Sequence, residues 1–311
     1  MKLFFLVSLL FANPAFANTN ACASLNEKTL KIGCTFGCDW EKYRNAVIEA
    51  GAAFGVQVQI VQLTNSEDLS RVDGFYSPGG HDIDAIYYAE NPRLPLKKRE
   101  YLKELHRCYG NAETFEQGEC FKNPTGCQCL GKEATPVQKS RDAFEISLFK
   151  EYSRNPKYRD LPALGVCYGW QAMAIASNIP LMPHLPAVDI VDTKSYFEFD
   201  ENGKRPDKKV SILVKRDPQD DFDGYSQFVV NSNHHQGIMA KDMKYQDRNG
   251  SKFRALSTYG ESKKVVYIAK RNSPPSLGIQ FHSERSPDNI RLLPYKWLIE
   301  AACQKAAGLN R

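Results

Sequence analysis

The first half of the chain alternates between two hydrophobic rhythms. The run "LKIGCTF", which begins at Leu30, is apolar enough for a buried strand, and positions 40–54 then carry apolar residues at helical spacing until Gly55 ends the pattern. The stretch "VQVQIVQL" at 56–63 alternates apolar residues with glutamine, as a half-buried strand does, and "VDGFYSPGG" is a short apolar run that ends in Pro78-Gly79-Gly80. The pattern therefore predicts strand, helix, strand and strand, in this order.

The rhythm breaks at about 91–135 and then resumes. A helical pattern covers 136–155, the β-type run "LPALGVC" follows, and a second helix is predicted at 168–177. The remainder alternates strand candidates with turns before a final helix at about 288–307. These strand candidates are "VSILVK", "QFVVNSN", "KFRALSTY", "VVYIAKR" and "LGIQFH". We interpret 91–135 as an insertion on the surface of the fold.

This order of elements predicts an α/β fold. Strands that alternate with helices in the first half imply a mostly parallel central sheet with right-handed crossovers, and the strand-rich second half predicts an antiparallel extension. The sequence contains no internal repeat and no low-complexity linker. One mature domain is therefore the simplest interpretation.

The N-terminus predicts export. Lys2 precedes an apolar run from Leu3 to Phe11, and "ANPAFA" ends in the small-x-small pattern Ala15-Phe16-Ala17. We interpret residues 1–17 as a cleaved signal peptide and 18–311 as the mature chain. The apolar run is shorter than the about 20 residues that a membrane-spanning helix needs, so we expect no membrane association after cleavage. The expected location is the periplasm or the exterior, or a lysosome-like lumen in a eukaryote.

Charge and cysteine content refine this picture. The formal net charge of +5 is spread along the 311 residues, which argues against the concentrated basic face of a nucleic-acid-binding protein. Nine cysteines fit an exported protein with disulfides, and eight of them could pair if Cys167 stays free. Four crowd into the insertion: Cys108, Cys120, Cys127 and Cys129. A structural zinc site is the alternative for this cluster, but Cys127 and Cys129 lack the usual Cys-x-x-Cys spacing.

Cys167 is the candidate nucleophile. It lies in "Gly165-Val166-Cys167-Tyr168-Gly169", where a predicted strand gives way to a helix, and this spacing matches the Gly-x-Ser-x-Gly elbow of hydrolases with sulfur in place of oxygen. Small residues on both sides let such a sharp turn form, and the positive end of the following helix favours a thiolate. The alternative is a buried structural cysteine.

Two further groups would complete an acyl-transfer site. His282 and Glu284 follow an apolar strand and lie two positions apart, so the carboxylate could orient the imidazole while the imidazole moves the proton. The backbone N–H groups of Gly80 and Tyr168 are the candidate oxyanion donors. In a parallel sheet these strand ends meet at one edge, where ligands bind.

Four motifs in this order resemble the class I glutamine amidotransferase-like superfamily. They are "SPGGHD", "GVCYGWQ", "NSNHHQGI" and "GIQFHSE", and "SRDAFE" resembles the helix before the elbow. The likeness is closest to its stand-alone γ-glutamyl hydrolases, the peptidase C26 group, and covers about 30–302 without the insertion. It implies a flavodoxin-like three-layer α/β/α sandwich. Ser283 stands where the family usually has proline, and Tyr168 and Trp170 are expected to add aromatic bulk beside the nucleophile.

The resemblance implies a cysteine hydrolase of γ-glutamyl amide bonds that works through an acyl-enzyme. Cys167 would be the nucleophile, His282 the base and Glu284 its orienting acid, with no cofactor and no metal. The residues implied to line the substrate site are Gly79, Gln171, Asn231, His234, His235 and Gln236.

Several alternatives remain open at this stage. The chain could be a γ-glutamyl transferase, a glutaminase-type enzyme or a binding protein that has lost turnover. The His234-His235 pair could contact substrate or only pack beside the site. The insertion could be a disulfide-braced lid or a surface decoration. Which γ-glutamyl substrate is used, and whether the chain forms a homodimer, stay open as well.

Overall fold

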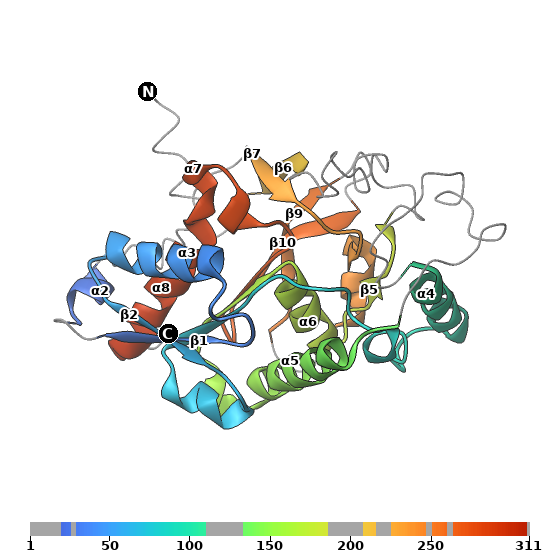
Figure 1. Ribbon diagram of the computed structural model, residues 1–311, viewed down its shortest axis with the longest axis horizontal. Coiled ribbons are helices and arrows are strands. Elements are labelled where there is room, and N and C mark those ends of the chain that lie inside the picture. Colours follow the sequence, from blue (N-terminus) through green and yellow to red (C-terminus); the bar gives the residue numbers. More distant parts are fainter. Residues whose placement is uncertain are drawn as a thin grey trace.

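The computed structural model describes residues 20–25, 29–109, 133–185, 208–215, 225–246, 251–259 and 264–309. The predicted signal peptide and Cys120, Cys127 and Cys129 lie outside these residues. The described part forms a nine-stranded sheet with helices on both faces (Figure 1). A separate two-stranded sheet pairs β5 (Leu181–Met182) with β8 (Gly237–Ile238).

Five neighbouring strands of the large sheet are parallel. They are β1 (Leu30–Cys34), β2 (Val58–Gln62), β3 (Gly74–Ser77), β4 (Ala163–Val166) and β11 (Ser276–Ile279). Their order in space is β2-β1-β3-β4-β11. β1, β3, β4 and β11 carry almost only buried residues, as expected where helices cover both faces of a sheet.

Four antiparallel strands extend the sheet beyond β11. They are β10 (Val265–Arg271), β9 (Arg254–Tyr259), β6 (Lys208–Lys215) and β7 (Tyr225–Ser232), in this spatial order. The predicted combination of a mostly parallel sheet with an antiparallel extension is therefore confirmed. β11 is the strand where the two halves meet, because it pairs in parallel with β4 and antiparallel with β10.

Helices cover the two faces in pairs. α3 (Glu41–Ala53) packs on α8 (Leu293–Ala306) over one face, and α5 (Pro136–Arg154) packs on α6 (Tyr168–Ala176) over the other (Figure 1). The predicted final helix is divided into α7 (Asp288–Arg291) and α8, and Pro294 lies in the first turn of α8, where a missing N–H costs nothing. The result is a three-layer α/β/α arrangement.

One long helix was not predicted. α4 (Leu96–Tyr109) lies in the segment interpreted as an irregular insertion. Its sequence "LKKREYLKELHRCY" is dominated by charged residues, and only Leu102, Leu105 and Cys108 form a narrow buried stripe. This stripe is too sparse to give a clear helical period, but three-residue spacing is sufficient to hold the helix against the domain.

For two disulfides, both cysteines lie among the described residues. Cys22 of the short helix α2 (Asn20–Ala23) is bonded to Cys303 of α8, and Cys34 at the end of β1 is bonded to Cys38. Cys108 is disulfide-bonded as well, and Cys167 is a free, buried cysteine. The expected division between a free Cys167 and paired cysteines thus holds for the described residues.

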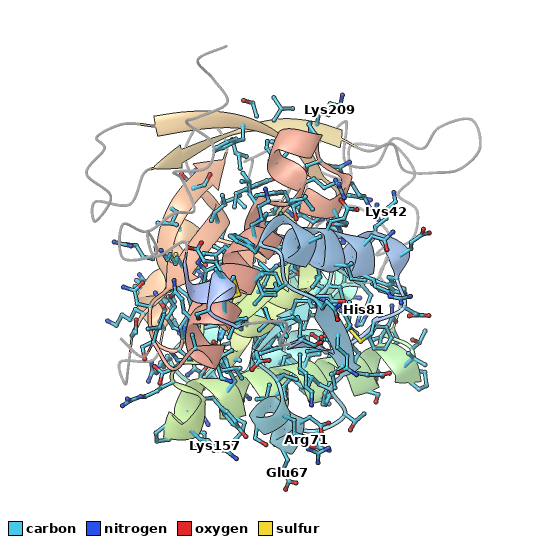
Figure 2. All side chains as sticks on the ribbon, turned by 90° about the vertical axis from the view of Figure 1, so that its left-hand side faces the viewer. Lys42, Glu67, Arg71, His81, Lys157 and Lys209 are labelled. Carbon is cyan, nitrogen blue, oxygen red and sulfur yellow. A yellow bond between two sulfur atoms is a disulfide. The ribbon has the colours of Figure 1, made fainter. Side chains whose placement is uncertain are left out.

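Several charged side chains lie at the periphery of the molecule. Lys42, Arg71 and Lys157 project from separate elements in Figure 2, whereas His81 lies further in. In the described ranges, no helix combines the length and apolar character required to cross a membrane.

Candidate active site

Cys167 occupies a strained turn between β4 and α6. Its backbone has φ 50° and ψ −103°, a region that residues with a side chain rarely adopt, and its N–H donates to the carbonyl oxygen of Ile279 at 2.7 Å. Such strain persists only where the surroundings hold it, and it is concentrated at functional sites. The predicted elbow is therefore present, and the neighbouring strand β11 holds it.

The flanking glycines are required by close contacts. A Cβ atom on Gly165 would lie 2.7 Å from backbone atoms of Gly169, and a Cβ atom on Gly169 would lie 2.2 Å from the carbonyl oxygen of Ser77. Strand β4, helix α6 and the end of β3 thus approach one another at backbone distance. This approach brings the N-terminus of α6 next to the segment that contains Pro78-Gly79-Gly80.

His282 and Glu284 form a buried hydrogen-bonded pair beyond the end of β11. Nδ1 of His282 donates to Oε1 of Glu284 at 2.7 Å. The residues 283–285 form a single 3-10 turn that directs the carboxylate back to the ring. The Ser286 hydroxyl donates to the carbonyl oxygen of His282 at 2.8 Å, and the backbone N–H of Asn231 donates to that hydroxyl at 2.9 Å. Ser283 is the first residue of this turn.

Charges determine the protonation of this pair. Burial alone would lower the pKa of His282, but the neighbouring Cys167 and Glu284 raise it to about 10. Burial raises the pKa of Glu284, and the His282 imidazolium outweighs this and lowers it. Cys167 also hydrogen-bonds to His282. The arrangement therefore favours an imidazolium at His282 beside an ionised Glu284 carboxylate.

A chain of amides reaches the sulfur from the other side. Nε2 of Gln171 donates to the carbonyl oxygen of Gln236 at 3.1 Å and lies 3.4 Å from Oε1 of Gln280. Because a backbone carbonyl can only accept, it fixes the orientation of the Gln171 amide, and this amide in turn fixes that of Gln280. Nε2 of Gln280 then faces Sγ of Cys167 at 3.7 Å. Gln171 thus acts on the site through Gln280.

Tyr43 on α3 connects the glycine loop to the histidine. Its hydroxyl accepts a hydrogen bond from the backbone N–H of Gly79 at 3.0 Å and lies 3.2 Å from Nδ1 of His282. Burial and the Glu284 carboxylate raise the pKa of Tyr43 well above its usual value, so the phenol keeps its proton. The N–H of Gly79 is therefore occupied. Those of Gly80 and Tyr168 find no acceptor within the described ranges and remain available as donors.

The segment 231–236 mainly braces the site. His234 contacts the carbonyl oxygen of Gln236 and the hydroxyl of Tyr267 through its two ring nitrogens, at 2.7 and 3.1 Å. His235 pairs with Asp82 at 2.6 Å. Oε1 of Gln236 accepts from the N–H of Ile83 at 3.0 Å. The contacts of His235 and Gln236 fasten the loop after Gly80 to the segment that follows β7.

Asn231 differs from its neighbours in this segment. It lies at the end of β7, and its carbonyl oxygen accepts from the N–H of His282 at 2.8 Å. Its buried Oδ1 atom has no hydrogen-bond partner among the residues that the structure describes. Asn231 is thus a member of the predicted substrate-lining group whose side-chain oxygen is unused among the described residues, while its backbone contacts His282.

The two aromatic residues of the elbow each have a defined partner. The Tyr168 hydroxyl donates to Asp142 of α5 at 2.8 Å, and the Trp170 ring packs edge-on against Phe253. Both side chains are fully buried. The contacts of these side chains are thus with α5 and with the segment before β9.

Sequence reasoning missed three residues of this region. Tyr43, Gln280 and Arg141 were not singled out, although Arg141 lies within the quoted "SRDAFE". A buried arginine and a tyrosine on the helix after β1 give no signal without knowledge of what they contact. The position of Gln280 two residues before His282 placed it on the same strand face and offered the one usable indication. In the described part of the chain, no group of three or more His, Cys, Asp or Glu side chains is arranged to hold a metal ion.

The fold and the site together define a class of protein. A mostly parallel sheet with a cysteine elbow beside a histidine from the neighbouring strand is the architecture of a glutamine amidotransferase-like cysteine enzyme. A profile of the family Glutamine amidotransferase class-I matches residues 138–296, just over half of the chain. The chain belongs to the class-I glutamine amidotransferase family.

Other comparisons add little. A search of curated proteins finds no match. Among solved structures, the chain is similar to a putative GMP synthase subunit from Thermoplasma acidophilum, with 13% identity and a TM-score of 0.49. The alignment covers 91% of this chain and 98% of that one. This likeness is too distant to bear on function.

Proposed function

We propose that the protein is an exported cysteine hydrolase that cleaves γ-glutamyl amide bonds through a thioester intermediate. The observation that carries the proposal is the buried pair of His282 and Glu284 facing Cys167, in which the pKa of His282 is raised to about 10. The four γ-glutamyl-hydrolase-like motifs support the substrate class. The disulfides of the described residues and the apolar N-terminal segment support export.

The geometry supports a two-step reaction. The Cys167 thiolate attacks the γ-carbonyl carbon, a C–S bond forms, and the negative oxygen is held by the N–H groups of Gly80 and Tyr168. His282 gives its proton to the leaving nitrogen, and the C–N bond breaks. Water then attacks the thioester while His282 removes a proton from it, and glutamate leaves as the thiolate is restored.

Glu284 has an orienting role in this scheme. Its hydrogen bond holds Nδ1 as the protonated nitrogen, so that Nε2 is the nitrogen that exchanges protons with the reacting groups. Asn231 is a candidate contact to substrate because its backbone is bonded to His282 and its buried side-chain oxygen is unused among the described residues. Gly79 supplies no donor, because its N–H is bonded to Tyr43.

The test is glutamate release from a panel of γ-glutamyl compounds. The mature chain from Asn18 onward is given glutamine, a γ-glutamyl peptide, a γ-glutamyl amine and a folylpolyglutamate. The matched control is Cys167→Ser, which keeps the shape of the elbow. Release that disappears in the control supports the hydrolase. Release that rises only when an acceptor amine is added would indicate transfer instead, and no release with any compound would overturn the proposal.

A further inference from the structure

Arg141 is a buried cation to which the proposed reaction assigns no role. It lies in α5, and its side chain is 2% exposed. A buried charge is costly unless it is paired and hydrogen-bonded, and the partners of Arg141 therefore indicate what the protein gains from keeping it.

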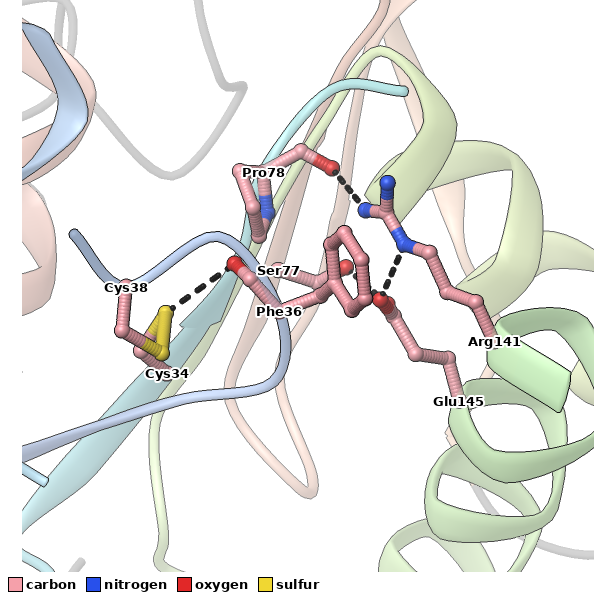
Figure 3. Close-up of a disulfide and its surroundings, with 7 residues drawn as sticks. All are labelled: Cys34, Phe36, Cys38, Ser77, Pro78, Arg141 and Glu145. Carbon is pink, nitrogen blue, oxygen red and sulfur yellow. Dashed lines mark hydrogen bonds and ion pairs between the residues drawn. A yellow bond between two sulfur atoms is a disulfide. The ribbon is translucent and has the colours of Figure 1, made fainter. Parts of the chain in front are cut away.

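Hydrogen bonds and aromatic rings hold the guanidinium in place. Nε donates to Oε1 of Glu145 at 2.7 Å, and Nη2 donates to the carbonyl oxygen of Pro78 at 3.0 Å. Glu145 accepts a second hydrogen bond from the hydroxyl of Ser77. The ring of Phe36 covers the group from the side of the Cys34–Cys38 disulfide, with its centroid 4.5 Å from Cζ (Figure 3).

The same group contacts both halves of the proposed oxyanion site. Its Cζ atom lies 3.9 Å from the ring centroid of Tyr168, the residue after the nucleophile. A Cβ atom on Gly80 would lie 2.1 Å from Nη1, so the Gly80 backbone packs directly on the guanidinium. Both residues that carry the candidate donors therefore pack against the same rigid, planar guanidinium.

We propose that Arg141 is the positioning residue of the oxyanion site: it sets the separation between the N–H groups of Gly80 and Tyr168. This inference rests on the proposed function, because it assumes that these two groups bind the negative oxygen of an acyl-transfer intermediate. Arg141 does not touch the reacting atoms. It acts through the carbonyl oxygen of Pro78, the backbone of Gly80 and the ring of Tyr168.

The identity of the side chain matters for this role. Arginine presents a fork that can bind Glu145 and Pro78 in two directions while its flat face lies on an aromatic ring. Lysine would retain the charge and one hydrogen bond, but it has no plane to pack between Gly80 and Tyr168. Arg141→Lys should therefore retain part of the function and Arg141→Met very little.

Two probes of Cys167 separate positioning from folding. Acylation by p-nitrophenyl acetate passes through an oxyanion and needs no γ-glutamyl group, whereas alkylation by iodoacetamide forms a C–S bond without any oxyanion. Loss of oxyanion stabilisation costs about 100-fold or more in acyl transfer. We expect acylation to fall about tenfold in Arg141→Lys and about 100-fold in Arg141→Met, with the alkylation rate of both variants within about twofold of the wild type.

Controls make each outcome decisive. Arg154→Met removes an exposed arginine from the same helix and should leave both rates unchanged. If Arg141→Met does not fold, Phe36→Leu opens one side of the cage without removing a charge, and it should lower acylation about threefold at constant alkylation. Equal losses in both reactions, or no loss of acylation, would overturn the inference.

The outcome is distinguishable from failure of the proposed function. A wild-type chain that reacts with the ester but releases no glutamate from any γ-glutamyl compound would refute the substrate class and leave the role of Arg141 measurable. A wild-type chain that is alkylated at Cys167 but never acylated by the ester has no working oxyanion site, and this would overturn the inference itself.

Discussion

The protonation of His282 leads to a pH prediction. The pKa of an ordinary histidine is near 6.5, but that of His282 is raised to about 10 by Cys167 and Glu284. In the proposed mechanism, the imidazolium that protonates the leaving nitrogen therefore persists through neutral pH and is lost only as the pH rises through about 10. We expect kcat/KM to remain high above pH 7 and to decline near pH 10, which a pH–rate profile measures. A decline centred near pH 6.5 would contradict this.

Glu284→Gln tests the source of that shift. The amide keeps the shape of the side chain but removes a negative charge that raises the pKa of His282, so the alkaline decline should move to lower pH. Loss of the orienting acid should also lower kcat/KM by about 100-fold. A lower rate with an unmoved profile would mean that Glu284 only holds the ring in place.

The glycines of the elbow give a stability prediction. In Gly169→Ala the new Cβ atom would lie 2.2 Å from the carbonyl oxygen of Ser77, and backbone cannot move aside as a flexible side chain can. We expect the free energy of unfolding to fall by about 2 to 3 kcal/mol in urea titrations. Gly55→Ala is the matched control, because a Cβ atom there meets nothing within 4 Å and only the positive φ of 71° penalises it. Equal losses in the two variants would mean that contact with Ser77 is unimportant.

At the scale of single elements, the loop closed by Cys34 and Cys38 contacts the buried Arg141 on one side and borders a surface groove on the other. Phe36 covers Arg141 from within, and Trp40, which is 39% exposed, borders an open groove on the outer side together with Arg44 and Ile48. The disulfide closes a short loop, so it constrains the unfolded chain only weakly. Its main effect should therefore be on the position of Phe36.

The double variant Cys34→Ser/Cys38→Ser tests this division. We expect the free energy of unfolding to fall by about 1 to 2 kcal/mol and the acylation of Cys167 by p-nitrophenyl acetate to slow about threefold, with alkylation unchanged. Serine variants are preferable to a reducing agent, because a free thiol would itself attack the acyl-enzyme. Unchanged acylation would show that Phe36 stays in place without the bridge.

Elements with a strong period could be predicted from the sequence, and the others could not. The strands and helices around Cys167 and His282 had clear apolar runs, and their ends converged as a parallel sheet requires. Helix α4 was missed because charge hides its narrow apolar stripe. The spatial order of the antiparallel strands depends on long-range pairing, which no local pattern contains. The contacts of Tyr43 with Gly79 and His282, and of Arg141 with Pro78, could not be predicted for the same reason, because they join residues distant in sequence.

At the scale of the whole molecule, the two ends of the fold are tied together. The bond from Cys22 to Cys303 spans 281 positions and attaches α2 to the helix that covers β1, β3 and β4. A crosslink over so long a stretch removes much more freedom from the unfolded chain than one over a short loop.

Cys22→Ser/Cys303→Ser should therefore lower the free energy of unfolding by about 4 kcal/mol, measured by denaturant titration without reducing agent. The rate of Cys167 alkylation at 25 °C should be unchanged, because neither cysteine contacts the site. The comparison with Cys34→Ser/Cys38→Ser is informative: a smaller loss for the long-range bond than for the short one would show that strain or residual structure outweighs chain entropy.

The register between β4 and β11 determines the distance between Cys167 and His282. Gly165 lies opposite Gly278 and Val166 opposite Ile279, so Cys167 and His282 emerge one and three residues beyond the last paired positions. A slip of one residue would shift the two side chains by about 3.3 Å and turn one of them to the other face. The two segments are more than a hundred residues apart along the chain, and this register exists only once the centre of the sheet is complete. A partly folded chain would thus carry an ordinary thiol, and reactivity would appear together with the native sheet.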